Sequence, residues 1–189
     1  DGLNRINPNT GEIEAFLHDP DDPTTISANW IWGICEDKNG YIWIGTYRGG
    51  LNRIDPQTKA VKHFRNEADN PNSLSHDEVL ILKTGSSGYI WAGTSAGLNR
   101  IDPDNESFTT YFHDPDDPNS LSGSDILMLH EEDNGDLWVG TSIGLNRLRP
   151  VNQKEGPPTY EIETFYEADG LPSNFIKSIQ SDEFGNLWV

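Results

Sequence analysis

The chain has 189 residues, a net charge of −18 at pH 7 and a single cysteine, Cys35. The excess of carboxylates would repel a polyanion, so we expect no nucleic-acid partner. One cysteine permits no intrachain disulfide. No apolar run approaches the ~18 residues of a membrane-spanning helix, so we expect no direct membrane insertion by this segment. The chain starts at Asp1 without an initiator methionine, and we expect a fragment or a processed chain.

One sequence motif, here called the phrase, recurs along the chain. Residues 40–46, 88–94 and 135–141 share the pattern Gly-x-[Ile/Leu]-Trp-x-Gly-Thr, and Gly-Leu-Asn-Arg follows each of them. The chain opens inside this phrase at residues 2–5 and closes inside it at residues 185–189. Its tryptophans recur at intervals of 48, 47 and 50 residues, as Trp43, Trp91, Trp138 and Trp188. Self-similarity at roughly 40–50 residues is typical of a solenoid, a propeller or an array.

Each period predicts four short antiparallel strands. In the unit that spans residues 74–113, Gly, Pro and Asn predict turns at residues 85–88 and 102–105. The strands expected around these turns are residues 78–83, 89–94, 97–101 and 107–112. The first two strands are apolar on both faces, whereas a sheet that covers a single core usually alternates polar and apolar residues. Each small sheet is therefore expected to lie between two neighbours, like the blades of a propeller.

The predicted fold class is all-β, a single β-propeller array over residues 1–189 with four four-stranded repeats of about 47–50 residues. The first segment holds third and fourth strands only, and the last segment holds first and second strands only. The expected divisions are a half blade at 1–17, blades at about 30–65, 78–112 and 125–166, and a half blade at 174–189. The half blades could close a four-bladed ring in one chain or an eight-bladed ring between two chains. We expect instead a segment of a larger propeller.

The repeated phrase resembles the two-component regulator propeller repeat. The linking phrase at residues 70–75 and 117–122, which share Pro-Asn-Ser-Leu-Ser, resembles that repeat as well. The resemblance covers essentially the whole chain and implies a piece of the periplasmic sensor region of a hybrid two-component system. Members of that family build seven-bladed propellers, often two in tandem, and dimerise through a following domain. Many of them sense polysaccharide fragments.

Residues that recur in every unit are expected to serve the fold. One glycine of the phrase ends a strand where the chain approaches a neighbour, and the next opens a strand at a φ that suits glycine. These glycines are Gly45, Gly93 and Gly140, and then Gly50, Gly97 and Gly144. The repeat tryptophans are expected in the core. The Asn-Arg pairs at 52–53, 99–100 and 146–147 are expected to tie strands or blades together, and the alternative is a ring of arginines that binds an anion.

Acidic loops link the units. Residues 18–23 and 113–118 both read His-Asp-Pro-Asp-Asp-Pro, and residues 65–71 form a looser copy. Carboxylates suit Ca²⁺, but the central Gly and closing Glu of the EF-hand loop are missing. Pro and Asp also explain these loops as turns. We therefore predict no tight metal site.

A ligand pocket should be built from positions that differ between blades. The turn at residues 46–50 is one residue longer than the turn at 94–97, and it carries Tyr and Arg where the other carries small residues. The residues that head the innermost strands also differ, and both sets are expected on one face. The candidate ligand-binding residues are Tyr47, Arg48, Trp30, Trp32, His76, Glu78 and Asp125. The alternative is that these are variable surface loops.

Aromatic platforms and converging polar groups suit an oligosaccharide or a similar small ligand. The sequence has no Gly-x-Ser-x-Gly, His-Glu-x-x-His or phosphate-loop motif, so we expect no catalytic residues, no enzyme activity and no cofactor. The function predicted is an extracytoplasmic, periplasmic ligand-sensing or interaction module of a two-component sensor. One alternative is a propeller enzyme, a glycoside hydrolase or lyase acting on a polysaccharide, and another is a structural protein-docking scaffold. A homodimer could form through the parent protein or through exchanged ends.

Overall fold

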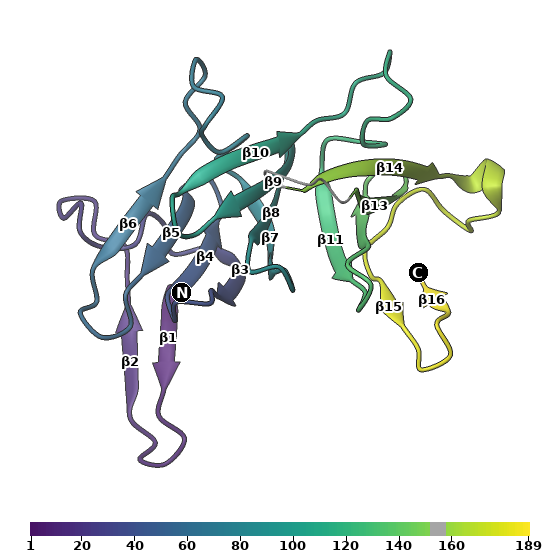
Figure 1. Ribbon diagram of the computed structural model, residues 1–189. Helices are drawn as coiled ribbons and strands as arrows, with labels where there is room; N and C mark the ends of the chain where they lie inside the picture. The colour runs from purple at the N-terminus through teal and green to yellow at the C-terminus, as the bar shows by residue number, and fades with distance from the viewer. Residues whose placement is uncertain (152–157) are drawn as a thin grey trace.

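The computed structural model describes residues 1–151 and 158–189, and the described chain curves into an open arch (Figure 1). It is all-β apart from one short 3-10 turn, η1 (Glu167–Asp169). Three four-stranded and two two-stranded antiparallel sheets follow one another along the arch. The predicted fold class of repeated propeller blades is confirmed.

In each complete sheet the strands lie side by side in the order of the sequence. The first sheet, blade 1, contains β3 (Ile31–Glu36), β4 (Ile42–Thr46), β5 (Gly50–Ile54) and β6 (Val61–Phe64). Blade 2 contains β7 (Val79–Thr84), β8 (Ile90–Thr94), β9 (Gly97–Asp102) and β10 (Ser107–Tyr111). Blade 3 contains β11 (Ile126–Glu131), β12 (Leu137–Thr141), β13 (Leu145–Val151) and β14 (Thr159–Phe165).

The two feet of the arch are half sheets. The N-terminal half blade pairs β1 (Leu3–Ile6) with β2 (Ile13–Phe16), and the C-terminal half blade pairs β15 (Gln180–Ser181) with β16 (Leu187–Trp188). Figure 1 shows them apart, in purple at one foot and in yellow at the other. The described chain therefore does not close a four-bladed ring on itself.

The blades stack through their faces around a shared inner edge. Strand β3 lies beside β7, and β7 lies beside β11, so the first strand of each blade is the innermost. Trp43 of blade 1 packs against Leu82 and Ile90 of blade 2, and Trp91 of blade 2 packs against Leu129 of blade 3. Both tryptophans are fully buried. Burial of both faces of each sheet explains why the inner strands are apolar on both sides.

A glycine at the end of each second strand makes this stacking possible. A Cβ atom on Gly45 would lie 2.5 Å from Val79 Cγ1, and one on Gly93 would lie 2.6 Å from Ile126 Cγ2. Both neighbours belong to the next blade. At the following glycine position, Gly50 has a φ of 77° as predicted, but Gly144 has no positive φ. That prediction was wrong for Gly144, where the need for glycine comes from crowding: a Cβ would lie 2.9 Å from Ser122 Oγ and 3.0 Å from the carbonyl of Phe165.

The repeat tryptophans are less uniform than their periodicity predicts. Trp138 is only partly buried, and Trp188 is 66% exposed. The core prediction is therefore wrong for Trp188, because β16 pairs with β15 and has no third strand on its other edge within the described residues. Cys35 is also only partly buried.

The repeated asparagine ties each long loop to its own blade. Asn99 Oδ1 accepts a hydrogen bond from the backbone N–H of Ser75 at 2.9 Å, and Asn99 Nδ2 donates to Ser75 Oγ at 2.7 Å. Ser75 Oγ in turn lies 2.8 Å from Thr94 Oγ1. The same Ser-Thr-Asn arrangement recurs as Ser27, Thr46 and Asn52 and as Ser122, Thr141 and Asn146. Buried polar groups need such partners, which explains why these residues repeat together.

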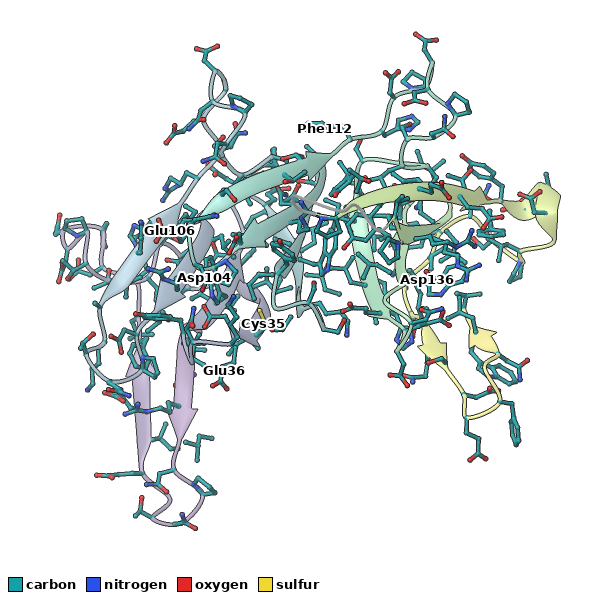
Figure 2. All side chains as sticks on the ribbon, in the orientation of Figure 1. Cys35, Glu36, Asp104, Glu106, Phe112 and Asp136 are labelled. Carbon is teal, nitrogen blue, oxygen red and sulfur yellow. The ribbon has the colours of Figure 1, made fainter. Side chains whose placement is uncertain are left out.

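The repeated arginines make structural contacts rather than a ring. Arg53 forms a salt bridge of 3.1 Å to Glu106, which lies in the β9–β10 turn of the next blade. Figure 2 shows Glu106 and Asp104 against blade 1. Arg53 also stacks over Tyr41, with its Cζ 4.6 Å from the ring centroid. Arg147 instead pairs with Asp136 inside its own blade.

The acidic loops form local turns. Asp114 Oδ1 accepts a hydrogen bond from the N–H of Asp116, and Asp117 Oδ1 accepts one from the N–H of Asn119, both at 2.9 Å. His113 Nδ1 lies 2.6 Å from the carbonyl oxygen of Leu121 and closes the loop. Turn formation accounts for the repeated Asp and Pro, and the absence of a tight Ca²⁺ site stays a prediction.

Candidate functional site

Six of the seven predicted ligand-binding residues form one contiguous surface, here called the rim site. It comprises Trp30, Trp32, Tyr47, Arg48, His76 and Glu78. Trp30 and Glu78 immediately precede the innermost strands of blades 1 and 2, and Tyr47 and Arg48 form the β4–β5 turn. The N–H of Tyr47 donates to the carbonyl oxygen of Trp30 at 2.9 Å, which brings the turn against the head of β3.

Three aromatic rings form one side of the rim site. The Tyr47 ring centroid lies 5.4 Å from that of Trp30 and 5.1 Å from that of Trp32, with tilted planes. Such spacings are favourable for aromatic pairs. The β3–β4 register shifts between Ile31 and Gly33, so Trp32 occupies a β-bulge, a device that re-aims a side chain. Trp30 is 61% exposed and Trp32 is 49% exposed, so two indole faces remain open to a ligand.

Arg48 joins the aromatic cluster to the next blade. Its Cζ lies 4.8 Å from the Tyr47 ring centroid, within cation–π range, and its Nε donates to Glu78 Oε1 at 3.0 Å. Arg48 has a φ of 62°, a left-handed conformation that is unfavourable for residues other than glycine. The same turn therefore has an added residue, a disfavoured backbone and a contact between two blades.

Glu78 lies at the centre of a polar network. The hydrogen bond from Arg48 lowers the pKa of the Glu78 carboxyl, so this group is ionised at neutral pH. Ser95 Oγ lies 3.2 Å from Glu78 Oε2 and 2.9 Å from His76 Nδ1. His76 Nδ1 also accepts from the N–H of Glu78 at 3.0 Å, which leaves the proton of the neutral ring on Nε2. Hydrogen-bonding groups of both kinds thus lie beside the aromatic rings.

Sequence reasoning missed Ser95, which connects His76 to Glu78. The sequence comparison treats Ser95 only as one of the small residues of blade 2 that stand where blade 1 has Tyr47 and Arg48. A signal was present, because Ser95 occupies the position in blade 2 that Tyr47 occupies in blade 1. A polar residue in the turn between the second and third strands is therefore a candidate partner for an acid at the head of the first strand of the same blade.

Asp125 is separate from this network. It heads the innermost strand of blade 3, and its Oδ2 accepts a hydrogen bond from Ser142 Oγ at 3.2 Å. This pair repeats the Glu78–Ser95 pair of blade 2. In the C-terminal half blade the equivalent head position is occupied by Phe175, and Lys177 Nζ lies 5.1 Å from the centroid of its ring. The acid–serine pair therefore occurs in blades 2 and 3, whereas blade 1 and the C-terminal half blade have an aromatic residue at this position and a cation over an aromatic ring.

The family model described as two component regulator propeller matches residues 25–48 and 170–189. These two stretches are therefore similar to two component regulator propeller repeats. The first matched stretch contains Trp30, Trp32, Tyr47 and Arg48, which are four of the six residues of the rim site. No curated protein sequence matches the chain.

Solved propeller structures share the fold. The extracellular domain of BT3049 from B. thetaiotaomicron, described as a hybrid two component system, is 22% identical over 99% of this chain, with a TM-score of 0.66. The corresponding domain of BT4673 from the same organism is 18% identical over 100% of this chain, with a TM-score of 0.65. This chain spans only 29% and 32% of those two chains.

A third propeller of similar fold is an enzyme. Catalytically inactive virginiamycin B lyase from Staphylococcus aureus, crystallised with quinupristin, is 22% identical over 86% of this chain, with a TM-score of 0.58. This chain covers 47% of the lyase. Likeness at this level of identity concerns the fold, and function must be argued from the site.

Proposed function

We propose that this array of propeller repeats is an extracytoplasmic ligand-binding module of a two-component sensor, and that its rim site binds an oligosaccharide or a similarly polar small molecule. One observation carries the proposal: blade 1 replaces the acid–serine pair of blades 2 and 3 with exposed aromatic rings and an arginine. Positions that serve the fold repeat, whereas the residue at this position differs between blades. Open indole faces beside hydrogen-bonding groups suit a ligand with both apolar faces and hydroxyl groups.

The cellular location proposed is the periplasm. The family matched by the repeats supports a place in a two-component regulator, and two solved propellers of similar fold are extracellular domains. No helical segment within residues 1–151 or 158–189 has the length and apolar character that crossing a bilayer requires.

The state of Glu78 argues against a role as a general acid. A general acid at neutral pH needs a raised pKa, whereas Arg48 lowers that of Glu78. Its carboxylate is also engaged by Arg48 and Ser95. Because virginiamycin B lyase has a similar fold, a propeller enzyme is the alternative. Enzyme activity would be recognised by the release of a cleaved product from the bound molecule.

The experiment is a glycan array followed by calorimetry on the best glycan. The double variant Tyr47→Ser/Arg48→Ala gives blade 1 the side chains of blade 2, and we expect affinity to fall at least about tenfold because an aromatic anchor is lost. Its melting temperature should stay nearly unchanged because both side chains lie at the surface. Phe112→Ser removes an exposed aromatic ring elsewhere and should leave affinity unaltered.

Two results would contradict the proposal. One is the absence of glycan binding by the intact chain. The other is equal affinity in the double variant and the unaltered chain, which would mean that the ligand binds elsewhere. Release of a cleaved product, abolished in Glu78→Gln, would favour the enzyme alternative, and a large fall in melting temperature of the double variant would assign these residues to the fold.

A further inference from the structure

A groove lies between the outer strand of blade 2 and the loop that links blades 1 and 2. This loop groove has a volume of about 390 Å³, and its lining comes from loop residues 66–71 and 73–75 and from Thr110 and Phe112. Figure 2 shows Phe112 where β10 ends, and its side chain is 56% exposed. Blade 2 lies between two complete blades, so the groove belongs to a fully built part of the array.

In blade 1 a side chain of the blade itself spans the corresponding place. His63 lies opposite Asn52 across β5 and β6, as Thr110 lies opposite Asn99 across β9 and β10, so His63 and Thr110 are equivalent. The Nε2 atom of His63 lies 2.8 Å from the carbonyl oxygen of Thr25 in the loop before blade 1. A carbonyl oxygen only accepts hydrogen bonds, so the imidazole N–H is the donor. The ring therefore joins the outer strand to the loop in blade 1.

Blade 2 has no such ring at this position. The Thr110 hydroxyl donates to Asn99 Oδ1 at 3.3 Å, and it does not reach the loop. Ser73 precedes the repeated serine by two residues, as Thr25 does, and its carbonyl oxygen accepts no hydrogen bond from any described residue. The loop also has Ala68 where the loops before blades 1 and 3 have proline. Smaller side chains at two positions therefore leave the loop groove open, with an unused acceptor in its lining.

The loop groove also has an open aromatic ring and two carboxylates in its lining, from Phe112, Glu67 and Asp69. The nearest cation in the sequence, Arg65, is directed to Asp77, with Nη1 3.8 Å from Oδ2. No described residue forms an ion pair with Glu67 or Asp69. An aromatic face beside carboxylates attracts a cation. A ligand that has both a positive charge and planar N–H donors would satisfy the carbonyl, the ring and the carboxylates together.

Elsewhere in the chain an arginine occupies a setting of this kind. It lies over an aromatic ring and forms a salt bridge with a carboxylate in three places: Arg53 with Tyr41 and Glu106, Arg48 with Tyr47 and Glu78, and Arg147 with Trp138 and Asp136. The loop groove has the ring and the carboxylates, and the described residues supply no arginine to its lining. A guanidinium suits this place better than an ammonium, because it is planar, less strongly hydrated and stacks on aromatic faces.

We propose that the loop groove binds an arginine side chain presented by an extended segment of a partner protein, separately from the ligand of the rim site. The guanidinium stacks on Phe112, donates to the carbonyl oxygen of Ser73 and is neutralised by Glu67 and Asp69. The net charge of −18 attracts a basic segment and accelerates its association at low salt. The loop groove is thus a docking site on the outside of the array, and its occupant is defined by the guanidinium.

Nuclear magnetic resonance with short peptides tests the proposal. The probe is acetyl-Gly-Arg-Gly-amide, titrated at millimolar concentrations into the 189-residue chain, and acetyl-Gly-Lys-Gly-amide is the matched control. The arginine peptide should shift the backbone amide signals of Ser73 and Phe112 saturably, and the lysine peptide should bind at least about threefold more weakly because an ammonium cannot stack. Affinity should fall as salt is added, since the contact is between exposed charges. Absence of saturable shifts at these residues would overturn the proposal, as would equal binding of the two peptides.

Two variants locate the peptide in the loop groove. Thr110→His gives blade 2 the ring that blade 1 has at this position, so it should abolish the shift at Ser73 and keep the melting temperature nearly unchanged. Phe112→Ser removes the stacking face at an exposed position and should weaken binding about two- to fivefold, which decides the matter if Thr110→His does not fold. Tyr47→Ser, in the rim site, is the control and should leave the affinity for the peptide unaltered. Full affinity in Phe112→Ser would refute the proposal, and so would loss of affinity in Tyr47→Ser.

Discussion

The repeated asparagine allows the most specific prediction about how the rim site is held in place. Asn99 is fully buried, and its side chain makes two short hydrogen bonds to Ser75, at 2.9 and 2.7 Å. It makes weaker contacts with Thr110 Oγ1 at 3.3 Å and with the carbonyl oxygen of Ala92 at 3.2 Å. Ser75 precedes His76, so this asparagine positions the loop that carries His76 and Glu78 of the rim site.

The magnitude follows from these contacts. A typical hydrogen bond contributes about 1 kcal/mol net, and an unpaired buried group costs about 1–3 kcal/mol. Asn99→Ala removes two good bonds and leaves the N–H of Ser75 without its acceptor, so we expect a loss of about 2–4 kcal/mol. At about 2–4 °C per kcal/mol for a chain of this size, the melting temperature should fall by roughly 4–16 °C.

The assay is thermal and urea unfolding followed by tryptophan fluorescence. Asn119→Ala is the matched control, because Asn119 is exposed and, among the described residues, its side chain hydrogen-bonds only to Asp117, at 3.3 Å; it should change stability by less than about 0.5 kcal/mol. Ser75→Ala and the double variant complete a cycle, in which we expect a coupling of at least about 0.5 kcal/mol. Equal effects of Asn99→Ala and Asn119→Ala would refute the reasoning, as would full additivity with Ser75→Ala.

Three further predictions concern single groups. Arg48→Gly should melt at a higher temperature than Arg48→Ala, because glycine relieves the left-handed φ of 62°; the reverse order would show that this turn is not strained. Calorimetry should detect no tight Ca²⁺ binding, and micromolar binding abolished by Asp116→Asn would contradict the assignment of the acidic loops to turns. Burial raises the pKa of the Cys35 thiol to about 11, so the reactive thiolate is scarce at neutral pH and gains population only as pH rises toward that value. Rapid labelling of Cys35 by Ellman's reagent at pH 7 in the folded chain would contradict the raised pKa of the thiol.

Local patterns in the sequence determine the repeated part of the architecture. Three local features specify the four-stranded unit: the period of the Trp-x-Gly-Thr motif, the alternation of polar and apolar residues along the strands, and the turns at Pro and Asn. Each of these features depends only on residues that are neighbours in the sequence. The repeat also predicts that Gly93 lies at a close approach, and the structure identifies Ile126 as the neighbour. Breaks in the same repeat single out Tyr47 and Arg48 from the sequence alone.

What only the tertiary structure decides is how one blade meets the next. The Arg48–Glu78 ion pair joins residues from different blades, and its contact depends on the rotation between two sheets, which no local pattern encodes. Burial of equivalent tryptophans differs for the same reason: Trp43 is covered by blade 2, while Trp188 has no blade against it within the described chain. The same sequence motif therefore has a different environment in each blade, because the burial of its residues depends on which sheet is stacked against each face.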